Sequence, residues 1–161
     1  MITAWRLAHE DALRKNPDPF QPPPKENRWS TTASIVAYGS ANVALAAMEL
    51  LAHWGRYGRL DGYHLYSLRF SETDVEDALE RSPELDIEDR TQTRRYGDAW
   101  ASEQRSVVLR VRSVVVPFSD NYVINPRHPD APRVLGTVES HGAFVYDKRI
   151  VELVQIASGR A

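Results

Sequence analysis

The sequence contains no cysteine. This absence excludes disulfide bridges, thiol nucleophiles and zinc sites built on cysteine, and it is compatible with a reducing compartment. Five histidines are present, but none has the His-Glu-x-x-His spacing of a helical zinc site. We therefore expect no metal site and no bound cofactor.

Glycine and long apolar runs are also scarce. Eight glycines are scattered over 161 residues, so neither a phosphate-binding loop nor a dinucleotide-binding glycine fingerprint can be found. No window approaches the roughly 20 apolar residues of a membrane-spanning helix. The segment Met1-Ile2-Thr3-Ala4-Trp5-Arg6 lacks the apolar run of a signal peptide. We expect a soluble, cytoplasmic protein without a membrane partner.

The charge balance is nearly neutral, with a formal net charge of −2. A nucleic-acid partner is therefore not favoured, because such proteins usually carry a strongly basic face. Hydrophobic residues make up 42% of the chain and charged residues 26%, as in ordinary globular domains. The length also fits one domain. We expect residues 1–161 to form a single domain.

Hydrophobic periodicity predicts more strands than helices. Alternating or β-branched segments predict strands at residues 3–8, 34–38, 63–70, 107–116, 133–138 and 143–146. Helical spacing predicts helices at 41–54 and 91–103, and Thr73 with Glu76 forms a capping-box pattern. The proline-rich residues 17–24 favour an irregular loop. Because strands and helices do not alternate regularly, we expect an α+β fold with a mostly antiparallel or mixed sheet.

The helix at residues 41–54 carries one carboxylate, Glu49. Ser40 is the expected N-cap, Gly55 the expected end, and the expected buried stripe is Val43, Ala47, Leu50, Leu51 and Trp54. Helical geometry places Glu49 to one side of this stripe, with Asn42, Leu45 and His53. A solvated surface position is the ordinary interpretation. However, the helix is apolar nearly all round, so we expect Glu49 to have either a partner or a function.

Arg6, Arg28 and Ser113 are further candidates for chemistry. The two arginines lie on or beside the first two extended segments, where paired guanidinium forks could hold a diphosphate. The alternative is a pair of surface arginines that neutralise nearby acids. Ser113 interrupts a run of valines, so its hydroxyl could be buried and would then need a partner, which a strand neighbour could also supply.

Seven segments in order resemble the RES domain, a family named for an arginine, a glutamate and a serine. The resemblance runs from Trp5 to about Arg149. The segments are Trp5-Arg6-Leu7, Arg28-Trp29-Ser30, Val36-Ala37-Tyr38-Gly39-Ser40, Ala44-Leu45-Ala46-Ala47-Met48-Glu49-Leu50-Leu51, Tyr96-Gly97-Asp98-Ala99-Trp100, Val111-Arg112-Ser113-Val114-Val115-Val116-Pro117, and Asn121-Tyr122-Val123-Ile124-Asn125-Pro126-Arg127-His128-Pro129.

The resemblance implies an ADP-ribosyltransferase-like fold and an enzyme that degrades NAD. The family cleaves the nicotinamide–ribose bond with phosphate or water as acceptor, or transfers ADP-ribose to a protein. NAD would then be the substrate, with inorganic phosphate as a possible co-substrate. The resemblance also implies a toxin held inactive by a helix-turn-helix-containing antitoxin, and a homodimer within a toxin–antitoxin complex.

The resemblance assigns catalysis to Arg28, Glu49 and Ser113. Arg6, Tyr38 and Asn125 join Arg28 and Ser113 as NAD-binding residues. Glu49 would face the positively charged ribose of the transition state, the arginines would hold the diphosphate, Tyr38 would stack on nicotinamide, and Ser113 would bond to nicotinamide or ribose. The chain departs from the family at Glu26-Asn27, where two glycines are usual, and at Arg112, where a proline is usual.

Two alternatives remain open at this point. One is a mono-ADP-ribosyltransferase that modifies a protein target. The other is a catalytically silent nucleotide-binding protein that acts through its partner.

Overall fold

The computed structural model describes residues 1–53 and 59–159, and in this part of the chain seven strands form one sheet in the order β4-β5-β6-β2-β1-β3-β7. The strands are β1 (Ile2–His9), β2 (Ala37–Ser40), β3 (Tyr63–Phe70), β4 (Val75–Asp77), β5 (Val108–Arg112), β6 (Asp120–Ile124) and β7 (Glu139–Phe144). The pair β4–β5 is parallel and the other neighbouring pairs are antiparallel. The predicted α+β fold with a mixed sheet is confirmed.

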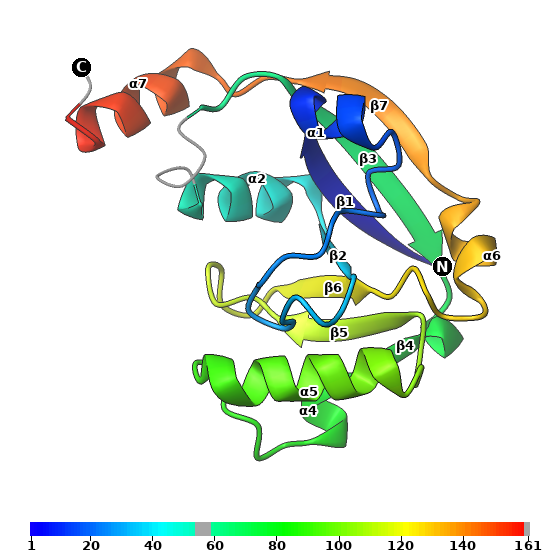
Figure 1. Ribbon diagram of the computed structural model, residues 1–161. Coiled ribbons are helices and arrows are strands. Elements are labelled where there is room, and N and C mark those ends of the chain that lie inside the picture. Colours follow the sequence, from blue (N-terminus) through cyan, green and yellow to red (C-terminus); the bar gives the residue numbers. More distant parts are fainter. Residues whose placement is uncertain (54–58, 160–161) are drawn as a thin grey trace.

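The helices lie around this sheet (Figure 1). They are α1 (Glu10–Lys15), α2 (Val43–Ala52), α4 (Ala78–Arg81), α5 (Arg90–Ser102), α6 (Ala131–Leu135) and α7 (Lys148–Ala157), with a 3-10 turn at Glu72–Asp74. Among the described residues, no helix has the length and apolar character that a membrane crossing requires.

The sheet consists of two halves whose strands pair with each other at a single register position. Strand β1 pairs with β3 along its whole length, but it pairs with β2 only through Trp5 and Ser40. Figure 1 shows the half β1-β3-β7 diverging from the half β2-β6-β5-β4, with α2 between them. Helix α2 begins shortly after the end of β2, so its side chains lie at the junction of the two halves.

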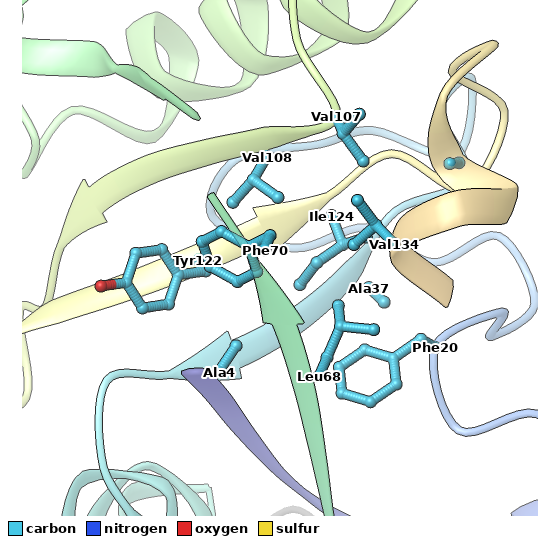
Figure 2. Close-up of a cluster of buried hydrophobic side chains, with 11 residues drawn as sticks. Ala4, Phe20, Ala37, Leu68, Phe70, Val107, Val108, Tyr122, Ile124 and Val134 are labelled. Atoms are coloured by element: carbon cyan, nitrogen blue, oxygen red, sulfur yellow. The ribbon is translucent and has the colours of Figure 1, made fainter. Parts of the chain in front are cut away.

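Buried apolar side chains cover both faces of the sheet. One cluster joins Leu68 and Phe70 of β3 to Ile124 of β6, and it is closed by Phe20 and Val134 (Figure 2). The second cluster packs Trp100 of α5 against the opposite face of β5 and β6. Burial of each large apolar side chain contributes about 1.5–3 kcal/mol, so these clusters fix the positions of the strands that carry the site.

Most of the predicted elements are present, and the differences have local causes. The strand predicted at 133–138 is wrong: α6 begins at Ala131, and Pro132 occupies its first turn, where a missing amide hydrogen costs nothing. The strand predicted at 107–116 ends at Arg112, because the chain turns there. The predicted capping box at Thr73 is instead formed by Ser71 and Asp74, in front of the 3-10 turn.

Helix α5 confirms the helix predicted at 91–103, including its glycine. A Cβ atom on Gly97 would lie 1.8 Å from the carbonyl oxygen of Trp29. Glycine normally weakens a helix interior, but only glycine allows α5 to approach the Trp29 backbone this closely. The approach holds the segment that carries Arg28 against α5.

Helix α2 differs from its prediction in its cap and in its buried side. Asn42, not Ser40, is the N-cap, and its side chain accepts a hydrogen bond from the Leu45 amide at 2.8 Å. Ser40 is instead the last residue of β2. The most buried side chains are Leu45 and Ala46, whereas the expected stripe residues Val43, Ala47, Leu50 and Leu51 are half-buried. Trp54 and Gly55 lie outside the described residues.

Candidate active site

Glu49 of α2 is held at the junction of the two half-sheets. One carboxylate oxygen, Oε1, accepts hydrogen bonds from Ser113 Oγ at 2.8 Å and from Asn121 Nδ2 at 2.5 Å. Glu49 lies one helical turn beyond the buried Leu45, so both side chains face the same way, toward the sheet. The carboxylate is therefore a bound group and not a fully solvated one.

Ser113 lies at the start of the turn that links β5 to β6. Its side chain is buried, and its hydroxyl oxygen accepts hydrogen bonds from the amides of Val115 at 3.1 Å and Val116 at 3.0 Å. A serine hydroxyl has one proton, and here that proton is donated to Glu49. The turn thus orients Ser113, and Ser113 in turn orients the carboxylate.

Asn121 is a member of the site that the sequence reasoning missed. It lies on β6 directly opposite Ser40 of β2, and its Oδ1 accepts a hydrogen bond from Ser40 Oγ at 2.7 Å. The residue opens the last of the family-like segments. However, a strand residue can be assigned to a site only when the strand pairing is known.

Arg6 of β1 reaches across the point where the half-sheets part. Its guanidinium donates a hydrogen bond to the carbonyl oxygen of Tyr38 at 2.7 Å. The neighbouring Trp5 pairs with Ser40, which contacts Asn121. Arg6 is therefore tied to β2, the strand whose Ser40 contacts Asn121.

Arg28 and Tyr38 lie on the α5 side of the junction. The half-buried guanidinium of Arg28 donates to the Ile87 carbonyl at 2.8 Å, and it forms no ion pair with any acid in residues 1–53 and 59–159. Tyr38 Oη accepts a hydrogen bond from the Trp29 amide at 3.2 Å. Burial raises the pKa of Tyr38 to about 12, so the phenol stays neutral. Tyr38 thus contacts both arginine-bearing segments.

A cavity of about 530 Å³ lies between the Ser113 turn and the segment that contains Ile87. Ser113, Phe118 and Ile87 are among the residues that line it, and the carbonyl of Ile87 is the one that binds Arg28. Phe118 is fully exposed and has a φ of 62°, a conformation that a bulky residue adopts only at a cost. The volume is in the range of small-molecule sites.

Asn125 lies away from this constellation. Its side chain is buried, donates to the Ala101 carbonyl at 3.1 Å and accepts from the Arg127 amide at 3.0 Å. Four residues of strand rise separate it from Asn121, roughly 13 Å. The structure therefore brings Glu49, Ser113 and Asn121 together, but it does not bring Asn125 to Glu49. The side chain of Asn125 instead supports the turn after β6.

The site contains carboxylate, hydroxyl, amide and guanidinium groups. In the described parts of the chain, no group of three histidine, aspartate or glutamate side chains is placed to hold a metal ion. Such a set suits a polar organic substrate with an anionic part. The carboxylate can stabilise developing positive charge, and the guanidinium groups can bind phosphate.

Comparison with known proteins gives a consistent match. A family model described as the RES domain matches residues 3–147. The "Prs ADP-ribosylating toxin" of Sphingobium sp. (strain YBL2) is 28% identical over 77% of this chain and 80% of its own length. A protein named "Toxin Res" from Photorhabdus laumondii subsp. laumondii is 28% identical over 78% of this chain and 81% of its own length.

A solved structure shares the fold. A chain of the M. tuberculosis MbcT–MbcA toxin–antitoxin complex superposes with a TM-score of 0.66, covering 96% of this chain and 89% of its own length. The sequence identity is 11%, so this likeness shows the fold alone. That fold is the ADP-ribosyltransferase-like one that the sequence resemblance implies.

Proposed function

The chain belongs to the RES-domain family, and from this we propose that it is the toxin of a toxin–antitoxin pair and cleaves the nicotinamide–ribose bond of NAD. Relatives of similar length are named as toxins, one of them as ADP-ribosylating. The observation that carries the proposal is the Glu49 carboxylate, which Ser113 and Asn121 hold by the same oxygen, Oε1.

The geometry of Glu49 suits a glycosidic cleavage. In this reaction positive charge develops on the ribose, much as in glycoside hydrolysis, and the nicotinamide of NAD leaves as a neutral molecule without acid assistance. A fixed negative group beside the sugar therefore stabilises the transition state. Both hydrogen bonds that the carboxylate accepts within residues 1–53 and 59–159 end on Oε1. The second oxygen, Oε2, is left to contact a ribose hydroxyl and the sugar carbon.

The arginines suit the diphosphate of the same substrate. Arg28 is a half-buried cation beside the cavity and pairs with no acid of the described residues, which favours an anionic ligand. Arg6 is fixed at the junction by the Tyr38 carbonyl. Binding of the diphosphate by the arginines would orient the ribose against Glu49, and this orientation would lower the activation barrier of the cleavage.

The proposal has four further parts: the acceptor, the partner, the oligomeric state and the location. Phosphate or water is the acceptor, and a helix-turn-helix-containing antitoxin is the partner that blocks the site. A homodimer within the toxin–antitoxin complex, and action in the cytoplasm, complete the proposal. The solved toxin–antitoxin complex with the same fold supports the antitoxin.

The test is incubation of the purified protein with NAD, with and without inorganic phosphate, followed by chromatography of the products. We expect free nicotinamide together with ADP-ribose, or with ADP-ribose carrying a new phosphate when phosphate is present. Glu49→Gln keeps the shape and both donors of the site, and it should lower the rate by roughly 100-fold or more. An unchanged rate in this variant would remove Glu49 from the mechanism.

A protein acceptor is the second candidate, favoured by the name of the ADP-ribosylating relative. With NAD labelled in its adenylate part, retention of label on protein after denaturation indicates transfer. Label that is wholly in small molecules indicates degradation. Nucleotide binding without any release of nicotinamide would instead indicate a catalytically silent protein.

A further inference from the structure

We propose that Asn121 and Ser40 are positioning residues, which lock the Glu49 carboxylate so that one defined oxygen faces the substrate. This inference rests on the proposed function, because it assigns these residues a part in the same reaction. Neither residue would touch NAD. They act through Glu49, in a chain of contacts that runs from Ser40 Oγ to Asn121 and from Asn121 to Oε1.

The orientation of the Asn121 amide is fixed by its two partners. Its nitrogen donates to the Glu49 carboxylate at 2.5 Å, and its oxygen accepts from the Ser40 hydroxyl at 2.7 Å. The reversed amide would place its oxygen against a carboxylate oxygen, and two acceptors repel each other. The Ser40 hydroxyl therefore helps to keep the donor side of Asn121 turned toward Glu49.

Ser40 is itself held by the backbone on both sides. It pairs with Asn121 of β6 and with Trp5 of β1, the single register position at which the two half-sheets meet. Its side chain is buried. The preceding residue must be small, because a Cβ atom on Gly39 would lie 2.9 Å from the Cβ atom of Ala4. Ser40 is thus a rigid point of the sheet.

The carboxylate is consequently held from two independent directions. Ser113 approaches from the turn after β5, and Asn121 approaches from the β2–β6 pair. Two donors on one oxygen fix both the position and the rotation of the carboxylate, so that Oε2 has a defined direction. Mutation of the outer partners of metal-binding side chains typically lowers metal affinity or activity 10- to 100-fold, and we expect a similar effect on activity here.

Asn121→Asp and Asn121→Ala form the decisive pair of variants. Aspartate has the shape of asparagine but places a second carboxylate against Glu49, whereas alanine only removes the donor. A positioning role predicts that Asn121→Asp lowers kcat more than Asn121→Ala, with KM for NAD changed less than kcat. It also predicts partial recovery of Asn121→Asp at lower pH, where one shared proton restores a donor. A purely structural role predicts the reverse order, because aspartate preserves the packing.

Ser40→Thr and Ser40→Val form a second, independent pair. Threonine and valine have nearly the same shape, but only threonine keeps the hydroxyl. We expect Ser40→Thr to retain kcat near that of the parent and Ser40→Val to lose roughly 10-fold or more. Equal kcat values in the two variants would overturn the role of Ser40. This pair also decides the proposal if an Asn121 variant fails to fold.

Ser106→Ala is the matched control. It removes a hydroxyl that bridges Trp100 and the Val108 carbonyl, at the opposite end of β5 from Ser113. It should lower the thermal midpoint without a change in kcat. If the parent protein releases no nicotinamide, the proposed function fails. If the parent is active and Glu49→Gln is not, but both Asn121 variants match the parent, the positioning inference alone fails.

Discussion

The hydroxyl of Ser113 lies 2.8 Å from Oε1 of Glu49, although 64 residues separate the two in the chain. One belongs to a turn after β5 and the other to the middle of α2. The serine hydroxyl donates its proton to the carboxylate, and its oxygen accepts hydrogen bonds from two backbone amides. This relationship indicates that the serine orients the glutamate carboxylate.

Ser113→Ala should reduce catalysis more than substrate binding. It removes one of the two donors to Glu49 and also the acceptor for the Val115 and Val116 amides, so the turn should loosen. We expect kcat to fall at least 10-fold while KM changes little. Steady-state kinetics of nicotinamide release measure both constants. Ser113→Thr keeps the hydroxyl and should recover much of the activity; equal loss in both variants would argue against the hydrogen bond.

Arg28→Lys should weaken NAD binding although it preserves the charge. Lysine lacks the planar fork that binds two phosphate oxygens at once, and it reaches the Ile87 carbonyl differently. We expect KM for NAD to rise about 10-fold or more, which corresponds to one good charged hydrogen bond of about 1.5–3 kcal/mol. Arg95→Lys, on the exposed side of α5, is the control and should leave KM unchanged. Wild-type affinity in Arg28→Lys would contradict the phosphate-binding role.

Gly97→Ala should destabilise the fold, although alanine is the better helix former. The added Cβ atom would overlap the Trp29 carbonyl oxygen at 1.8 Å, so α5 or the Trp29 segment must move. Overpacking costs about 1–3 kcal/mol and outweighs a propensity gain of about 1 kcal/mol only when the overlap is severe, as it is here. Thermal unfolding followed by circular dichroism measures the effect. Arg95→Ala on the same helix should change stability by no more than about 0.5 kcal/mol.

The ion pair between Asp74 and Arg133 should make part of the stability depend on pH. Hydrogen bonding from Arg133, at 2.5 Å, holds the pKa of Asp74 below its usual value. Because the folded pKa is depressed, this stabilisation is complete above the unfolded pKa of about 3.9 and is lost as pH falls through the folded value. Arg133→Met should therefore cost more stability at pH 7 than at pH 3. Urea unfolding at both pH values tests this.

The control for this pH dependence is a pair on the surface. Arg149 contacts Asp147, and both side chains are at least half exposed. Solvent screens such a pair, so Arg149→Met should have little effect on stability at either pH. A cost for Arg133→Met that does not change between pH 7 and pH 3 would show that Arg133 acts through packing alone.

Elements with strong local patterns were predictable from the sequence. The alternation of apolar and polar residues in β3 fits only a strand, and the spacing of apolar residues in α5 fits only a helix. Both predictions agree with the structure. The strand predicted at 133–138 was wrong, because a short apolar run fits a strand or a helix equally well. The prediction of the buried side of α2 was also wrong. Because this helix is apolar nearly all round, its own sequence does not determine which side packs against the neighbouring strands.

The sequence alone determined the family-like order of segments, and with it the residues Arg28, Glu49 and Ser113. Only the tertiary structure decided which amide reaches the carboxylate. Asn121 lies near the start of β6 and Asn125 directly follows its end, and the two residues look alike in the sequence. The pairing of Asn121 with Ser40 places its end of β6 beside α2, whereas Asn125 is turned toward Ala101. Strand pairing depends on residues far apart in the chain, so no local pattern could have made this choice.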